Sequence, residues 1–303
     1  MKNPGLRRML LIALWFSFVL TTLGEQPDPP FFRFGLVADV QYANKPPRGK
    51  RNYSESADRL RACVADFNQR GLAFVANLGD SIDGDGAKSA VDMTLIAGIF
   101  QQLTCPVRHV IGNHCLNLPR PVLLKTLGLK SPYYEFSRER WRFLVLDGMD
   151  VSPRSPEGSK QAREAKSFLA KNPKANKYAG AIGEDQMAWM RDQLVDAARQ
   201  KQRVILFCHQ PILAAASSRG ATLWNAAEVE ATLVQSGCVV AWINGHDHKG
   251  GYAFANGIHH LTVEGMIESP KGAGNYAIAS VFATRIAIEG KGLMSSRELK
   301  INP

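Results

Sequence analysis

The sequence predicts an α/β fold in which a mixed sheet is covered by helices. Three observations support this class. Short apolar segments alternate with helical stretches from Phe32 onward. A pair of neighbouring strand-like segments in mid-chain and a strand-rich end without helices are typical of antiparallel partners. No internal linker interrupts the chain, so we expect one domain over residues 31–303.

The first half of the chain is expected to open as β-α-β-α-β. Short apolar segments predict strands at 33–38, 72–78 and 107–111. The first helix is expected at 54–69, with Ser54 as its N-cap and Gly71 as its stop, and a second helix at 89–103. Residues 133–136 and 141–146 then predict an antiparallel hairpin turned through 137–140.

The second half begins with a segment of different composition. Residues 152–180 are rich in Lys, Ser, Pro and Asn, which indicates a surface excursion. The elements expected after it are helices at 184–202 and 224–235 and strands at 203–207, 238–243, 259–263, 276–282 and 285–289.

Composition limits the classes of protein that this chain can be. Its 303 residues are 45% hydrophobic and 21% charged, which excludes global disorder and supplies a sizeable core. A net charge of +10 favours anionic partners. The largest basic cluster, Arg48, Lys50 and Arg51, is too small for a nucleic-acid groove, so we expect no nucleic-acid partner. Five widely spaced cysteines without a CxxC pair form no small-domain disulfide framework.

The N-terminus has the pattern of a secretory signal peptide. Three basic residues among the first eight precede an apolar run from Met9 to Leu20, and small and polar residues lead to Gly24. The run is shorter than the roughly 20 residues that a membrane span needs. We therefore expect residues 1–24 to be cleaved. The mature protein would then be exported, periplasmic or secreted, with no stable membrane association.

Five short polar motifs stand just after five of the expected strands. In open α/β sheets ligands bind at the carboxyl ends of strands, so five loops at that edge can converge on one point. Each motif alone is compatible with a turn or cap, but five in order indicate one site. The motifs are Asp39-Val40-Gln41, Gly79-Asp80, Gly112-Asn113-His114, His209-Gln210-Pro211 and Gly245-His246-Asp247-His248.

The residue types in these motifs suit two divalent metal ions. Side chains at i and i+2 of an extended segment point the same way, so Asp39 and Gln41 can address one point together. The same spacing joins His246 and His248. Carboxylate, imidazole and amide-oxygen ligands suit Mn, Fe or Zn. Asp80 is the expected bridge between two ions about 3.5–4 Å apart.

This pattern predicts phosphoester chemistry. Two such ions would share a hydroxide that attacks phosphorus in line with the leaving group. Asn113 and His114 are adjacent and should point apart, so that one holds metal and the other faces substrate. We assign His114 as the catalytic imidazole that protonates the leaving group. The expected substrate is a phosphate ester or a pyrophosphate.

The ordered set of motifs resembles the calcineurin-like metallophosphoesterases from about residue 33 to residue 290. The resemblance implies a four-layer αββα sandwich, with two mixed β-sheets packed together and helices outside. It implies His114 as the catalytic histidine. It also implies two ligand sets that share Asp80: one holds Asp39, Gln41, Asp80 and His248, and the other holds Asp80, Asn113, His209 and His246.

Position 41 narrows the resemblance within that superfamily. Most members have His where this chain has Gln41, and Gln there is similar to the manganese-dependent ADP-ribose/CDP-alcohol diphosphatases. This implies Mn, with Fe, Zn or Mg as alternatives, and a small nucleotide cleaved to a nucleoside monophosphate and a phosphorylated partner. Further stretches resemble the same group: Leu146-Asp147, Asp150-Val151-Ser152, Trp224-Asn225, Gly250-Gly251-Tyr252 and Val263-Glu264-Gly265.

Four residues near the motifs carry further expectations. Arg51 is a candidate clamp for a substrate diphosphate, because guanidinium binds phosphate oxygens well, and a solvated basic loop is the alternative. Tyr252 is a candidate stacking partner for a nucleobase. Asp83 is expected in a turn. Cys115 stands where the family usually has an acid that would orient the histidine or tune its pKa, which puts the efficiency and pH optimum in question.

Two other classes of function stay open. One is a phosphomonoesterase or cyclic-nucleotide phosphodiesterase of the same fold. The other is a secreted, metal-containing binding protein with little turnover, which Cys115 favours. A panel of substrates with Mn added distinguishes these classes.

Overall fold

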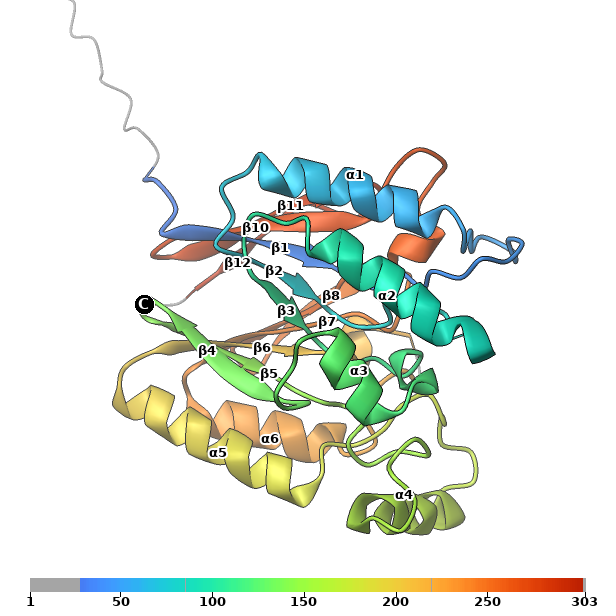
Figure 1. Cartoon of the computed structure of the whole chain (residues 1–303). Helices are drawn as coiled ribbons and strands as arrows, with labels where there is room; N and C mark the ends of the chain where they lie inside the picture. The colour runs from blue at the N-terminus through green and yellow to red at the C-terminus, as the bar shows by residue number, and fades with distance from the viewer. Residues whose placement is uncertain (1–27, 85, 219, 302–303) are drawn as a thin grey trace, which may run out of the picture.

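The structure is a computed structural model that describes residues 28–84, 86–218 and 220–301. Within these residues two six-stranded sheets pack face to face, and helices cover their outer faces (Figure 1). The four-layer αββα sandwich expected from the resemblance is therefore confirmed. The expected signal peptide at residues 1–24 lies outside the described residues.

The first sheet has the strand order β12-β11-β10-β1-β2-β3. It is mixed, because β1 pairs in parallel with β2 and antiparallel with β10. Three helices cover its outer face through a cluster that includes Phe67, Phe100 and Leu123. The elements are β1 (Phe32–Val37), β2 (Phe74–Asn77), β3 (Val107–His109), β10 (Tyr276–Val281), β11 (Arg285–Lys291), β12 (Arg297–Lys300), α1 (Ser56–Asn68), α2 (Ser89–Phe100) and α3 (Arg120–Thr126).

The second sheet has the order β4-β5-β6-β7-β9-β8 and is also mixed. Two helices cover it through a cluster that includes Leu194, Leu233 and Trp242. Its strands are β4 (Tyr134–Arg138), β5 (Trp141–Val145), β6 (Arg203–Cys208), β7 (Val239–Asn244), β8 (Gly251–Ala255) and β9 (Ile258–Thr262). The helices of this half are α4 (Lys160–Lys171), α5 (Glu184–Arg199) and α6 (Ala226–Ser236). Short 3₁₀ turns lie at η1 (Gly86–Lys88), η2 (Cys115–Asn117), η3 (Ala214–Ala216) and η4 (Met266–Glu268).

An aromatic cluster joins the two sheets. Phe34 stacks on Phe74 with ring centroids 5.0 Å apart, and Phe143 from the facing sheet meets Phe74 edge-on at 5.0 Å. Phe207 stacks on Phe143 at 5.8 Å. Such pairs contribute about 0.5–1.5 kcal/mol each beyond the apolar area they bury. They fix one sheet against the other, and so place the loops that follow β1 and β2 beside those that follow β6 and β7.

Several expected elements differ from the structure. Ser54 does not cap α1, because Glu55 occupies the N-cap position without a side-chain bond. The excursion at 152–180 contains a helix, α4, which the sequence pattern did not predict. Among the helical side chains of α4 only Ala165 is buried, so little apolar periodicity marks it, although Ser159 caps it by accepting from the Ala162 amide. The short α3, β8 and β12 were also missed. No helix in the described part of the chain is long and apolar enough to cross a bilayer.

Candidate metal centre

The predicted site residues follow strands of both sheets. Asp39 comes two residues after β1, and Asp80 three residues after β2. His209 follows β6 directly, and His246 lies just beyond β7. The loops meet because the amide of Asp39 donates to Gly79 O at 3.2 Å and the amide of Gly245 donates to His209 O at 3.1 Å.

The backbone at these strand ends adopts a conformation that side chains rarely take. Asp39, Gln41, Asp80 and His246 have φ values of 51°, 41°, 49° and 69°. Left-handed conformations at residues other than glycine cost about 1–3 kcal/mol each and concentrate at functional sites. Four of the predicted ligands therefore share a strain that the surrounding structure must support.

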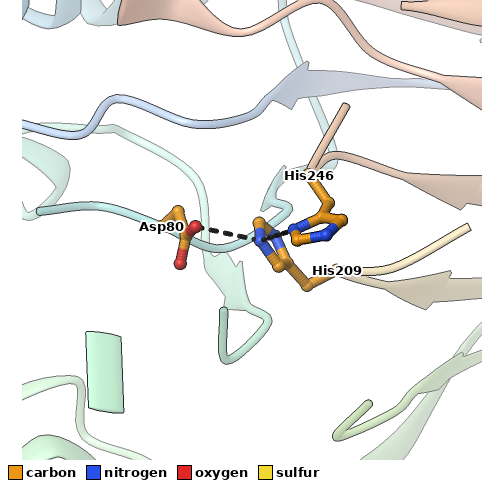
Figure 2. Close-up of side chains that lie close together, drawn as sticks. All are labelled: Asp80, His209 and His246. Atoms are coloured by element: carbon orange, nitrogen blue, oxygen red, sulfur yellow. Dashed lines mark hydrogen bonds and ion pairs between the residues drawn. The ribbon is translucent and has the colours of Figure 1, made fainter. Parts of the chain in front are cut away.

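Asp80, His209 and His246 form the first of two ligand clusters (Figure 2). Nε2 of His209 lies 3.0 Å from Oδ2 of Asp80, and Nδ1 of His246 lies 3.3 Å from the same His209 nitrogen. Potential ligand atoms of all three residues lie within 4.8 Å of one another. Nδ1 of His209 donates to Leu78 O at 2.8 Å, which turns Nε2 toward the centre.

Asp39, Gln41 and His248 form the second cluster. Nε2 of His248 lies 3.3 Å from Oδ1 of Asp39 and 3.1 Å from Nε2 of Gln41. The two clusters adjoin, because Oδ1 of Asp39 is also 4.0 Å from Nε2 of His209. The structure thus brings together six of the seven predicted ligands, and the seventh, Asn113, precedes His114, whose amide donates to Asp80 Oδ1 at 2.7 Å.

The atoms of these clusters fit divalent cations. Three oxygens of the predicted ligands are buried and have no hydrogen-bond partner in the described part of the chain: Asp39 Oδ1, Gln41 Oε1 and Asn113 Oδ1. Nε2 of His248 lies within ion-pair distance of Asp39 Oδ1 but forms no hydrogen bond with it. A buried polar atom without a partner costs about 1–3 kcal/mol. Divalent ions would satisfy these oxygens together with the imidazole nitrogens, which is the mixed ligand set expected from the sequence.

Electrostatics also favour positive charge in this space. Burial opposes ionisation of Asp80, but His209, His114 and His246 outweigh it and hold the pKa of the carboxyl well below its usual range. Burial likewise opposes charge on His209, yet Asp80 raises the pKa of this imidazole to about 9. Burial also opposes charge on His248, yet Asp39 raises the pKa of this second imidazole to about 9. Burial and the neighbouring His209 lower the pKa of His246 to about 4.

His114 is held beside the clusters by Asp83. Nδ1 of His114 donates to the Asp83 carbonyl at 2.6 Å, and a carboxylate oxygen of Asp83 lies 3.8 Å from the same nitrogen. Nε2 is thereby left for the substrate. Lys45 pairs with the Asp83 carboxylate. Asp83 therefore takes the orienting role expected from an acid at position 115.

Cys115 itself is enclosed by the protein core. It is fully buried in the apolar cluster under α1 and α2, where burial raises its pKa to about 12. Its thiol cannot exchange protons with substrate near neutral pH. The absence of an acid at position 115 consequently leaves the orientation of His114 intact.

Glu268 is a second residue that the sequence reasoning missed. Nδ1 of His248 lies 3.2 Å from Oε1 of Glu268, which orients the ring so that Nε2 faces Asp39. Nε of Arg51 lies 3.4 Å from the same oxygen. Arg51 thus contacts the carboxylate that orients His248, and its contact with substrate stays a prediction.

Tyr252 and Asp247 occupy other positions. The Tyr252 hydroxyl lies 2.9 Å from Nδ1 of His259, and Arg297 covers its ring. These contacts join β8, β9 and β12, so a nucleobase contact for Tyr252 stays a prediction without support from its neighbours. Asp247 accepts the amide of Ser218.

The αββα sandwich and a metal centre between strand ends of both sheets define the class of protein: a metal-dependent phosphoesterase. The profile of the calcineurin-like phosphoesterases matches residues 32–250. The chain belongs to that family, and the family expected from the motifs is confirmed.

Named relatives and a solved structure agree with this placement. A manganese-dependent ADP-ribose/CDP-alcohol diphosphatase from Oryza sativa subsp. japonica is 35% identical, with 90% of this chain and 95% of that protein covered. The enzyme of the same name from Arabidopsis thaliana is 34% identical, over 92% of this chain and 100% of that protein. The crystal structure of a dimetal phosphatase from Danio rerio superposes with a TM-score of 0.84 at 29% identity, covering 90% and 100% of the two chains.

Proposed function

We propose that this protein is an exported, manganese-dependent diphosphatase that cleaves ADP-ribose or CDP-alcohol-like nucleotides. The observation that carries the chemistry is the convergence of two carboxylates, three imidazoles and an amide on one buried space, in which Asp39 Oδ1 and Gln41 Oε1 have no hydrogen-bond partner among the described residues. The substrate class follows from relatives at 34–35% identity over nine-tenths of the chain.

The residues present divide the work between holding metal and moving a proton. Asp39, Gln41 and His248 would hold one ion, Asn113, His209 and His246 the other, and Asp80 both. Such ions lower the pKa of a water between them and polarise the phosphoryl oxygens. His114 stands outside both sets with its Nδ1 engaged by Asp83, so its Nε2 can pass a proton to the leaving oxygen.

A substrate panel tests this function. Mature protein is assayed with ADP-ribose, CDP-choline, cyclic AMP and p-nitrophenyl phosphate, each with Mn, Mg, Fe or Zn. The proposal expects the two diphosphates to be cleaved best with Mn, giving AMP and CMP. Cleavage of the aryl phosphate alone would contradict it and favour a phosphomonoesterase. Binding without turnover would favour the binding protein.

Export rests on the N-terminal pattern and has its own test. The full-length chain is expressed with an intact secretion system, and the N-terminus of the recovered protein is sequenced. A mature start at Glu25 in the exported fraction is the expected result. Full-length protein retained inside the cell would overturn export without affecting the enzymatic proposal.

A further inference from the structure

A cavity of about 400 Å³ opens directly on the catalytic histidine. Asn113 and His114 form one side of it, and the excursion at 152–180 forms the other through Arg154, Lys177 and Tyr178. The Tyr178 ring lies parallel to the His114 ring, with centroids 6.2 Å apart. The excursion is therefore folded over the metal centre at the side where His114 would deliver its proton.

The charge of this cavity is positive and uncompensated. Arg154 and Lys177 are exposed, and neither side chain has an ion-pair partner among the described residues. Of the described residues that line the cavity, Asp83 alone has a carboxylate, and this carboxylate is already paired with Lys45. Within residues 28–84, 86–218 and 220–301, two cations without ion-pair partners thus line the space next to His114, and the lining carboxylate of Asp83 is paired with Lys45.

We propose that Arg154 and Lys177 form a subsite for the leaving phosphate and so select diphosphates over other phosphodiesters. This inference rests on the proposed diphosphatase function. Water attacks the nucleoside phosphorus, and the bond from that phosphorus to the bridging oxygen breaks. The bonding pair stays on the bridging oxygen, which takes a proton from His114 and departs with the second phosphate. One proton of the consumed water restores His114 and the other passes to solvent. The departing phosphate gains one negative charge when it in turn releases its proton to solvent.

Charge-assisted hydrogen bonds explain the selectivity. An Arg or Lys placed where negative charge develops stabilises the transition state more than the ground state. A phosphodiester whose leaving group is an alcohol or a phenol brings no phosphate into this cavity. Its cleavage therefore gains little from Arg154 and Lys177, although it uses the same metal ligands and the same His114.

A matched pair of substrates tests the subsite. TDP-glucose and p-nitrophenyl thymidine 5′-phosphate transfer the same nucleotide, but only the first has a phosphate leaving group. In the double variant Arg154→Ala/Lys177→Ala we expect kcat/KM for TDP-glucose to fall about 100-fold, since each lost charged hydrogen bond costs about tenfold or more. The nitrophenyl ester should change less than about threefold on the same reasoning, and Arg154→Lys should recover part of the loss. Equal effects on both substrates, or none, would overturn the subsite.

Product inhibition separates this inference from the proposed function. Glucose 1-phosphate should inhibit nitrophenyl ester hydrolysis by the wild type and inhibit the double variant at least about tenfold less strongly. Lys174→Ala, an exposed lysine of the same excursion outside the cavity, is the matched control and should behave as wild type. If TDP-glucose is not cleaved but this inhibition depends on Arg154 and Lys177, the subsite stands and the diphosphatase function fails. If TDP-glucose is cleaved and the double variant matches wild type, the function stands and the subsite fails.

Discussion

Two histidines of the site owe their orientation to groups that bind no substrate. His209 donates through Nδ1 to Leu78 O at 2.8 Å, and Nδ1 of His248 lies 3.2 Å from the Glu268 carboxylate. In each case the other ring nitrogen is turned toward the carboxylates. Partners of this kind fix the tautomer of a ligating histidine and raise its basicity.

Glu268→Ala should therefore weaken metal binding although none of the predicted ligands is replaced. Loss of the carboxylate frees the His248 ring to rotate, and we expect Mn affinity to fall about 10–100-fold. The Mn affinity is measured by titrating metal-free protein with Mn and monitoring the free and bound ion by electron spin resonance. Glu298→Ala, on the exposed edge strand β12, is the control and should bind as wild type. Unchanged affinity in Glu268→Ala would show that His248 is oriented by other contacts.

His114 and Cys115 are neighbours with opposite expectations. His114→Ala removes the proton donor and should lower kcat by about 10²–10⁴-fold, while metal content stays at the wild-type level. Cys115→Ser alters a buried thiol that faces the core, so kcat should stay near wild type even if stability falls. Kinetics and elemental analysis on the same samples give both readouts. A large loss of kcat in Cys115→Ser, with metal retained, would return position 115 to the catalytic machinery.

At the scale of elements, the loop after β3 must approach Asp80 closely. A Cβ added at Gly112 would lie 2.1 Å from Asp80 Oδ1 and 2.5 Å from the Asp80 amide nitrogen. Neither the Asp80 side chain nor the backbone of its loop can shift to make room without displacing the metal centre. Glycine is required here for space.

Gly112→Ala should consequently lose metal binding and activity, or fail to fold. Gly98 in α2 is the matched control, since a Cβ there meets no atom within 4 Å. Alanine in a helix is about 0.5–1 kcal/mol better than glycine, so Gly98→Ala should retain activity and melt slightly higher. Thermal melts and Mn titrations of both variants check this. Gly112→Ala with wild-type Mn affinity would contradict the packing of this loop.

Much of the element pattern and of the ligand set could be read from the sequence, for a shared physical reason. Buried strands such as β1 and β7 are apolar runs, and polar residues directly after them stand out, which made Asp39 and His246 visible. The helix α4 was missed because it buries little apolar surface. Asp83 acts on His114 mainly through its carbonyl, which no residue pattern records. Glu268 reaches His248 from a 3₁₀ turn without periodicity.

At the scale of the whole molecule, the second sheet contains a buried histidine that opposes stability. His260 on β9 is buried, and neither ring nitrogen has a hydrogen-bond partner in the described part of the chain. Burial and the neighbouring His259 lower its pKa to about 4, whereas an unperturbed histidine has a pKa of about 6.5. The folded protein therefore favours the neutral ring. Keeping this ring neutral costs no stability above about pH 6.5, where the unfolded chain also has a neutral ring, and the free energy of unfolding falls as the pH drops from about 6.5 toward 4.

His260→Leu should stabilise the protein, and more so in acid. Replacing an unpartnered buried imidazole by an apolar side chain should raise Tm by about 2–4 °C near pH 7.5. The difference from wild type should widen at pH 5, because the variant no longer has the group that protonates on unfolding. Melts across this pH range measure both effects. A variant less stable than wild type at both pH values would show that His260 has a partner that offsets its burial.

The proposed chemistry requires that the two adjoining ligand clusters bind metal and that this metal is needed for phosphoester cleavage. The most direct measurement is a titration of metal-free protein with Mn, in which bound metal per chain and CDP-choline hydrolysis are followed together. We expect activity to be absent at the start and to reach its plateau as about two ions bind per chain. Asp80→Ala should bind fewer ions per chain than the wild type and should not reach the wild-type activity plateau. Full activity in metal-free protein, or a plateau with fewer than about one ion bound, would contradict the two-metal site.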